Sequence, residues 1–369
     1  MMTCNPKADA KATLPNLLDM SLLRTFADSR IEGSVSAVAS SGKPWIMGET
    51  NSIACEGKAG VTDTFGQALY LSAQALQYAS IGAAKIYLHQ GATLLTRGGN
   101  AQQANQGTKD GTPSFSAYSL LYPVNSTSRG QQRANPGFAS QLLLAEAIGT
   151  GNKSRILALD PPSGADARYF YAAAVYDESV PGGTGPARLI LINTEPYTEQ
   201  NEAPAGSSGF DASKFSRDNA VTFDFSSLLS AGSKAISSGS GNTNNKIQAK
   251  RLTAPYVDTK ETHLVTWAGQ SYKYAAPEGP VAIEDLSSAS GKITLRNSEA
   301  VLVFLRGDPF VAEGSDETNS GASTGASHGT QAGNPETKSS AAAPLAYSLA
   351  TSWLAVITAT TAAVVVAVF

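Results

Sequence analysis

The sequence has few of the residues that bind metal ions or contact nucleic acids. It contains only three histidines, His89, His263 and His328, each far in sequence from the others and from the cysteines. No metal-ligand spacing can therefore be written. The 27 basic and 30 acidic residues leave a net charge of -3, without the basic stripe that nucleic-acid-binding proteins carry. We expect no metal ion, no other cofactor and no nucleic-acid partner.

Cysteines and a secretion leader are also scarce or lacking. Cys4 and Cys55 permit one disulfide in an oxidising compartment, and nothing in the sequence indicates whether they meet. The first residues, Met-Met-Thr-Cys-Asn-Pro, have neither the cationic region nor the apolar run of a signal peptide. Because the other end of the chain carries a membrane signal, we expect the true N-terminus to lie further upstream.

One long hydrophobic run is present, at the C-terminus. Residues 353–369 carry no charge and no polar residue stronger than threonine. This tail fits a glycolipid (GPI) anchor signal, and a tail-anchored membrane helix is the alternative. We expect a Ser/Gly/Ala-rich disordered linker over residues 311–340, an anchor signal over residues 341–369, and a location at the cell surface or outside the cell. The candidate attachment residues are Ser339, Ser340 and Gly333.

Helical periodicity is strongest in the first 150 residues. Apolar side chains recur at helical spacing in three segments. The helices are expected at residues 14–27, 64–80 and 141–148. In the second of these, Gln67, Gln74 and Gln77 fall outside the apolar stripe, so we expect them at the surface.

Two short apolar runs, residues 45–47 and 85–88, predict buried strands of the parallel type. Gly48 should turn the chain after the first strand and present Glu49 at its carboxyl end. His89 follows the second strand. Because parallel strands end at a common edge of the sheet, these side chains should lie at the same face, which in a parallel barrel is the catalytic face.

Residues 91–133 form a long, polar, Gly-rich segment that contains Tyr118. Loops of this length in a compact domain are usually functional or disordered, and its place beside the two strand ends favours a function.

Short alternating strands take over from residue 151. Gly, Pro, Asp and Ser clusters separate them, as in an antiparallel β-sandwich, which we expect over residues 151–310. Asn125 and Asn152 begin glycosylation sequons, which matter only in a secreted protein. The strands are expected at residues 155–159, 168–176, 187–193, 220–225, 246–252, 263–267, 292–296 and 300–305.

Five motifs, in this order, resemble those of fungal glycoside hydrolase family 79, the β-glucuronidase-like enzymes. The likeness runs from about residue 14 to residue 305. The motifs are Gly-Glu-Thr-Asn-Ser at 48–52, Gly-Val-Thr-Asp-Thr-Phe-Gly at 60–66, His-Gln-Gly at 89–91, Tyr-Ser-Leu-Leu-Tyr-Pro at 118–123 and Trp-Ala-Gly-Gln-Ser-Tyr at 267–272.

The resemblance implies a retaining enzyme with a (β/α)8 barrel and a C-terminal β-sandwich. Glu49 would be the nucleophile after the seventh strand, and residues 85–88 would be the eighth. Residues 1–150 would then be the C-terminal remnant of the barrel. The acid/base, which the family carries in an Asn-Glu pair after the fourth strand, has no counterpart here, because Asn201-Glu202 lies in a predicted sandwich loop.

The other candidate site residues each have a structural alternative. Asn51 could bond substrate hydroxyls or cap its turn. His89 and Gln90 could line the sugar pocket, or they could be structural residues whose hydrogen bonds are satisfied at the end of their strand. Tyr118 could contact the uronic acid or pack on the barrel rim.

The sequence leaves two functions open. The first is a retaining glycosidase that removes β-linked glucuronic acid from glycans, with its acid/base outside this chain, so that the chain alone is inactive. The second is a non-catalytic, surface-anchored cell-wall protein that keeps the sandwich and the anchor.

Overall fold

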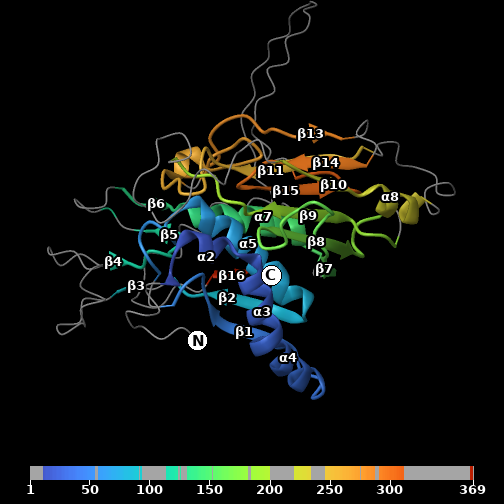
Figure 1. The fold of residues 1–369 in the computed structure, drawn as a ribbon, viewed down its shortest axis with the longest axis horizontal. Coiled ribbons are helices and arrows are strands. Elements are labelled where there is room, and N and C mark those ends of the chain that lie inside the picture. The colour runs from blue at the N-terminus through green and yellow to red at the C-terminus, as the bar shows by residue number, and fades with distance from the viewer. Residues whose placement is uncertain are drawn as a thin grey trace, which may run out of the picture. The chain divides into compact units, whose positions relative to one another are not determined.

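The computed structural model of the chain (Figure 1) describes residues 11–54, 57–90, 92–93, 114–123, 125, 131–151, 153–181, 184–199, 220–233, 246–274, 276–286, 291–310 and 366–368. Several predictions fall outside these residues. They concern Cys4, Cys55, Asn152, Asn201, Glu202, Gly333, Ser339, Ser340, the linker over 311–340 and most of the C-terminal tail.

The N-terminal helical segment begins as two helices, where the periodicity predicted a single one. Helix α2 (Leu14–Leu18) ends at Asp19, whose extended backbone interrupts the helix, and α3 (Met20–Phe26) begins after it. The Asp19 carboxylate accepts hydrogen bonds from the amide and hydroxyl of Ser21, at 2.9 and 2.5 Å, so this side chain favours a cap over a helix interior. A π-helical turn, η1 (Ala27–Ile31), and α4 (Glu32–Ala39) follow.

Strand β1 (Trp45–Thr50) pairs in parallel with β2 (Ala83–Leu88), which confirms the predicted parallel pair. Strand β1 is three residues longer than expected, however, and it is only partly buried, because Ile46 is 42% exposed. Within the described residues its outer edge has no partner strand. Residues Val366–Val368 form β16, which pairs antiparallel with the other edge of β2.

Helix α5 (Phe65–Ser80) lies at the centre of the helical region and contacts α2, α7 (Ala139–Ile148), β2 and β7 (Ser154–Leu159). The expectation that its glutamines lie at the surface is wrong, because Gln67, Gln74 and Gln77 are 0%, 3% and 6% exposed. A helix enclosed on all sides has no solvent face to give its polar residues. A 3₁₀ turn, η2 (Pro136–Phe138), leads into α7.

The predicted antiparallel sheet is confirmed, with every pairing in it antiparallel. Its strand order is β12-β11-β15-β9-β8-β7, with β13 also paired to β11, and β10 and β14 form a separate two-stranded sheet. The bounds are β8 (Phe170–Asp177), β9 (Arg188–Asn193), β10 (Val221–Asp224), β11 (Gln248–Thr253), β12 (Thr266–Trp267), β13 (Glu284–Asp285), β14 (Lys292–Leu295) and β15 (Glu299–Phe304).

Three details of this region differ from expectation. His263 lies in a 3₁₀ turn, η6 (Thr262–Leu264), so the predicted strand over 263–267 is reduced to β12. Strand β13 and helix α8 (Ser226–Ser233) were not anticipated. Short pairs β3 (Ala92–Thr93) with β4 (Ser114–Phe115), and β5 (Leu121–Tyr122) with β6 (Arg133–Ala134), complete the fold.

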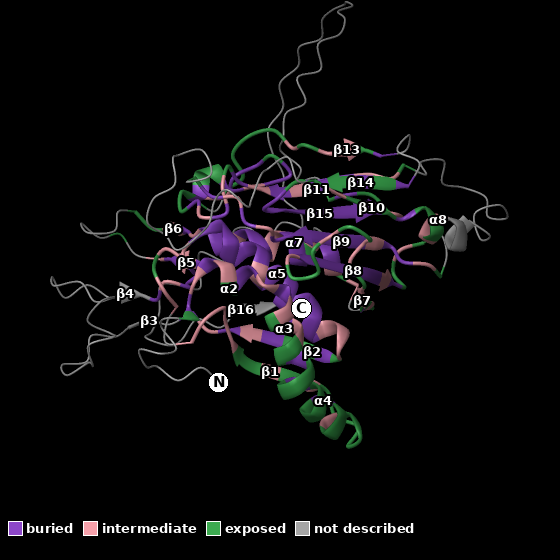
Figure 2. Ribbon diagram, in the orientation of Figure 1, coloured by how far each residue is buried: buried purple, intermediate pink, exposed green. Residues whose placement is uncertain are grey.

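Both faces of the central strands β8, β9 and β15 are buried, as their purple colour in Figure 2 shows. Along β8, Tyr171, Ala173 and Val175 join the core shared with the helices, while Phe170 and Ala172 join a second core with β10 and β14. This alternation follows from the two-residue period of a strand. The described residues, up to Phe310 and again at 366–368, belong to one compact unit.

A sandwich loop caps the N-terminus of α5. Thr64 makes no side-chain cap bond; instead, the Phe65 and Gly66 amides donate to the carbonyls of Thr259 and Val257, at 2.8 and 2.7 Å. A Cβ on Gly66 would lie 2.8 Å from the Leu14 side chain. The 60–66 motif therefore joins the helical region to the sheet domain.

Candidate active site

Glu49 lies in a bulge near the carboxyl end of β1. Met47 pairs with Ile86 and Thr50 pairs with Leu88, so two residues of β1, Gly48 and Glu49, stand opposite one residue of β2. The predicted turn at Gly48 is therefore an irregularity inside the strand. Bulges re-aim side chains and are frequent beside active sites. Glu49 is exposed, and among the described residues its side chain makes no hydrogen bond or ion pair.

Four residues next to this bulge are joined in a closed ring by hydrogen bonds between side chains and to two backbone carbonyls. Asn51 Nδ2 donates to the His89 carbonyl at 2.7 Å, and His89 Nδ1 lies 2.5 Å from the Tyr118 hydroxyl. Gln67 Nε2 closes the ring, donating to the Tyr118 carbonyl at 2.8 Å and to Asn51 Oδ1 at 3.2 Å. The ring joins the ends of β1 and β2 to α5 and to the loop that contains Tyr118.

The aromatic rings of His89 and Tyr118 also pack edge to face, with their centroids 5.8 Å apart. Tyr118 is 5% exposed, whereas His89 is half-buried. Asn51 Oδ1 also accepts from the Ser52 amide at 2.6 Å, so Asn51 caps its turn as well as joining the ring. The structure thus brings Asn51, His89 and Tyr118 together beside Glu49.

Gln90 is turned away from this group. Its side chain is buried, and Oε1 accepts from the Leu120 amide at 2.7 Å. The Gln90 carbonyl accepts from the Ser116 hydroxyl at 2.6 Å and from the Ser119 hydroxyl. These bonds shape the 116–120 loop, so Gln90 acts on the site through that loop in this conformation.

Polar groups also lie behind the site, inside the helical core. Gln74 Nε2 approaches the Asn51 carbonyl at 3.4 Å and the hydroxyls of Tyr70 and Tyr78 at 3.2 and 3.4 Å. Burial raises the pKa of both tyrosines. They therefore stay neutral at physiological pH and serve as hydrogen-bonding groups.

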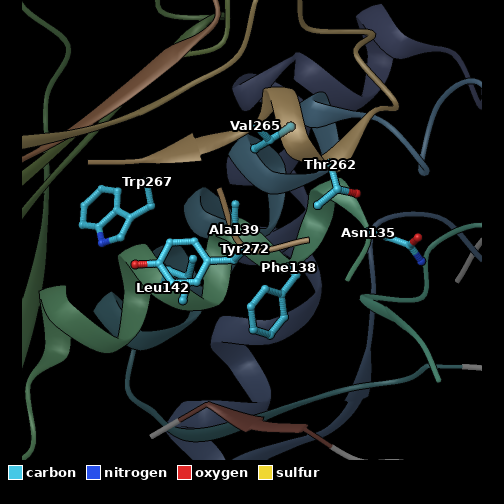
Figure 3. Close-up of a pocket in the computed structure, with 8 residues that line it drawn as sticks. All are labelled: Asn135, Phe138, Ala139, Leu142, Thr262, Val265, Trp267 and Tyr272. Atoms are coloured by element: carbon cyan, nitrogen blue, oxygen red, sulfur yellow. The ribbon is translucent and has the colours of Figure 1, made fainter. Parts of the chain in front are cut away.

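A small pocket lies between η2, α7 and the segment from Thr262 to Tyr272 (Figure 3). Its walls are mainly apolar and include Phe138, Leu142 and Trp267. The free volume is about 10 Å³, which is at the lower limit for one water molecule. It is too small for a sugar ring, and the Trp267 indole, 4% exposed, is packed in the core.

The structure also places one of the two predicted glycosylation residues. Asn125 is exposed, and its Oδ1 accepts from the Gln132 amide at 2.8 Å. Among the described residues, no group of three His, Cys, Asp or Glu side chains could hold a metal ion. In the same part of the chain, no helix is both long and apolar enough to cross a membrane.

Sequence reasoning missed Gln67, the one ring member not foreseen. The amphipathic pattern assigned it to solvent, and its partners, Asn51 and Tyr118, lie far away in sequence. The one available signal was a polar residue on the turn of α5 that follows the 60–66 motif.

Comparison with known proteins supports the family resemblance. Residues 171–302 match the model of the glycosyl hydrolase family 79 C-terminal beta domain. The chain is similar to a β-glucuronidase of Neurospora crassa, with 25% identity over 286 residues that cover 74% of this chain and 44% of that protein.

A solved structure shares the fold. It is a 4-O-α-L-rhamnosyl-β-D-glucuronidase from Fusarium oxysporum in complex with Rha-GlcA, with a TM-score of 0.52 and 23% identity over 80% of this chain and 50% of that one. The chain spans about half the length of the relatives it matches. The sheet domain therefore matches the family 79 C-terminal β domain. The resemblance to β-glucuronidase-like glycoside hydrolases is confirmed for their C-terminal portion.

Proposed function

We propose that this chain is the C-terminal part of a retaining glycoside hydrolase that removes β-linked glucuronic acid from glycans. The observation that carries the proposal is the exposed carboxylate of Glu49 in the β1 bulge, beside the ring of Asn51, His89, Tyr118 and Gln67. The β-glucuronidase relative supports the substrate class. The parallel β1–β2 pair would belong to a barrel whose other strands lie outside this chain.

A retaining mechanism needs two carboxyl groups about 5 Å apart. In our proposal, Glu49 attacks the anomeric carbon and forms the glycosyl–enzyme ester, while the leaving oxygen takes a proton from a second carboxylic acid. That acid would come from the missing part of the barrel. The same group would then deprotonate the water that hydrolyses the ester. General acid–base assistance contributes about 10²–10⁴-fold to such rates, so we expect the 369-residue chain alone to be inactive.

The neighbouring side chains would hold the sugar. His89 is half-buried. Its imidazole Nδ1 faces the Tyr118 hydroxyl, and its other nitrogen, Nε2, takes no part in the hydrogen bonds that join the four residues. We propose that Nε2 contacts a sugar hydroxyl, with Asn51 and Tyr118 holding the strand ends beside Glu49 in place. Gln90 would contribute by shaping the 116–120 loop.

The test uses this chain extended upstream with the preceding half of the Neurospora crassa relative. An aryl β-glucuronide should be hydrolysed by the extended protein, and Glu49→Gln should abolish turnover while leaving the circular dichroism unchanged. Glu32→Gln is the matched control, because Glu32 is an exposed glutamate of the nearby helix α4.

A 2-fluoro-glucuronyl fluoride should label the extended protein at Glu49, since trapping needs a covalent ester and fluoride leaves without protonation. Label on another carboxylate would contradict the assignment of Glu49 as the nucleophile. A folded extended protein that neither reacts nor turns over would favour a non-catalytic surface protein.

A further inference from the structure

Gln67 occupies a position where a buried amide holds two separate segments at once. It is 0% exposed, and its Nε2 has two acceptors, the Tyr118 carbonyl and Asn51 Oδ1. The first belongs to the loop after residue 113, and the second to the end of β1.

The orientation of this amide is fixed by its acceptors. Reversing it would set Gln67 Oε1 against the Tyr118 carbonyl and Asn51 Oδ1, three acceptors with no donor among them. In the observed orientation, Oε1 is buried without a partner. A buried, unpaired acceptor costs stability. In the observed orientation, the Gln67 amide nitrogen is therefore bonded and its oxygen is left unpaired.

Backbone packing also locks the side chain in place. Gly137, in η2, lies directly against it: a Cβ at Gly137 would be 2.7 Å from Gln67 Oε1 and 2.9 Å from its Cδ. Because Gly137 has a negative φ, its backbone conformation is open to other residues, and the missing side chain leaves the space that Gln67 fills.

We propose that Gln67 is a positioning residue: it holds the Tyr118 loop and the end of β1 so that the Tyr118 hydroxyl stays on His89 Nδ1. With Nδ1 accepting from that hydroxyl, the neutral imidazole carries its proton on Nε2. Gln67 thus sets which proton His89 presents. That this proton faces a sugar rests on the proposed function, whereas the positioning itself does not.

The test uses the full chain labelled with ¹⁵N-histidine at pH 8, where a histidine is neutral. His89→Asn assigns the His89 signals, and the exposed His263 is an internal reference in the same spectrum. Wild type should show His89 as the Nε2–H tautomer. Gln67→Met keeps the length of the side chain and removes both donated bonds, so His89 should shift towards a mixture of tautomers.

The same variant should loosen the loop. Amide hydrogen exchange at Ser119 and Leu120 should become about tenfold faster when two neutral hydrogen bonds are lost. The matched control is Gln77→Met, because Gln77 lies on the same helix, is also buried, and also has an unpaired Oε1, but bonds none of the ring residues. The control should change neither His89 nor the loop.

Gly137→Ala provides a second route that leaves Gln67 itself unchanged. Its Cβ should displace the Gln67 amide and reproduce the shift of the His89 signals, even if Gln67→Met does not fold. Gly33→Ala, with no atom within 4 Å of the added carbon, is its control. Wild-type His89 signals in both Gln67→Met and Gly137→Ala would overturn the proposal.

The two proposals fail separately. If these signals move as expected while the extended protein neither turns over glucuronides nor is labelled, the positioning role stands and the proposed function falls. If turnover depends on Glu49 but His89 is insensitive to Gln67, the reverse holds.

Discussion

The Trp267 indole donates a hydrogen bond to Glu146 Oε2 at 3.1 Å, and the same carboxylate pairs with the Lys250 ammonium at 2.7 Å. Glu146 lies on α7, while Lys250 and Trp267 lie on the large sheet. The Phe310 amide donates to Glu146 Oε1 at 2.8 Å. This one largely shielded carboxylate thus links the helical region to the sheet domain.

We expect Lys250→Met to cost about 3–5 kcal/mol, because it leaves the Glu146 carboxylate buried without its counter-ion. Lys250 and Glu146 side chains are only 4% and 10% exposed. The double variant Glu146→Leu/Lys250→Met should recover much of the loss. Urea unfolding of the full chain measures both, and Lys292→Met, at an exposed pair 3.6 Å from Asp224, should cost less than about 1 kcal/mol. Equal losses at the two lysines would contradict this account.

Gly66→Ala should destabilise the protein by about 1–3 kcal/mol, since the added carbon would meet the side chains of Leu14 at 2.8 Å and Val257 at 3.3 Å. Gly33→Ala, on exposed helix α4 with open space around it, should instead stabilise by about 0.5–1 kcal/mol. Thermal unfolding of the two variants beside wild type checks the pair. A neutral Gly66→Ala would mean that the 60–66 motif is not needed for this packing.

Asp177 should make the free energy of unfolding depend on pH in the acid range. Burial tends to raise its pKa, but hydrogen bonds from Ser179 and the ion pair with Arg188 outweigh this and hold the pKa below its ordinary value. A folded-state pKa below the unfolded one stabilises the protein above the unfolded pKa of about 3.9. This contribution is lost as the pH falls through the folded pKa.

Asp177→Asn should therefore cost stability at pH 7 and flatten the fall in stability between about pH 5 and pH 2. Ser179→Ala, which removes one of the hydrogen bonds to the carboxylate, should flatten it less. Urea unfolding at a series of pH values gives the curves. Parallel curves for wild type and Asp177→Asn would show that this carboxylate does not carry the acid dependence.

The strands of the sheet domain could be predicted because they are short apolar runs bounded by turn residues, and seven of the eight lie close to their expected positions. The strand expected at 263–267 shrank to Thr266–Trp267 because residues 262–264 form a 3₁₀ turn. Strand β13 has only two residues, which is too short for the alternation of a strand to show in the sequence. The local pattern is enough for these strands, whether both faces are buried, as in β15, or apolar and exposed residues alternate, as in β14.

The candidate site was only partly predictable. Glu49, Asn51, His89 and Tyr118 follow from strand ends and motifs, and the structure gathers the last three. The bulge at Gly48 arises from register against β2, and the role of Gln67 arises from contacts with segments 16 and 51 residues away. Such features depend on tertiary structure, and no periodicity within one segment contains them.

The C-terminal tail provides the last prediction. Residues 353–369 carry no charge, and small residues precede them at Ser339 and Ser340. In the structure, Val366–Val368 pair with β2. If the tail is a glycolipid-anchor signal, as we propose, processing removes it, and this strand is absent from the mature protein.

Expressed behind a secretion leader in a eukaryotic host, the protein should reach the cell surface, be released by phosphatidylinositol-specific phospholipase, and yield no peptide from 353–369 by mass spectrometry. Replacing Ser339 and Ser340 with leucine should reduce surface attachment, because the attachment site needs small residues. If Gly333 is the site, that variant should remain anchored and Gly333→Leu should not. Protein that stays on the membrane after phospholipase and keeps the 353–369 peptide would identify the tail as a membrane-spanning helix, since only an anchor signal is cleaved away.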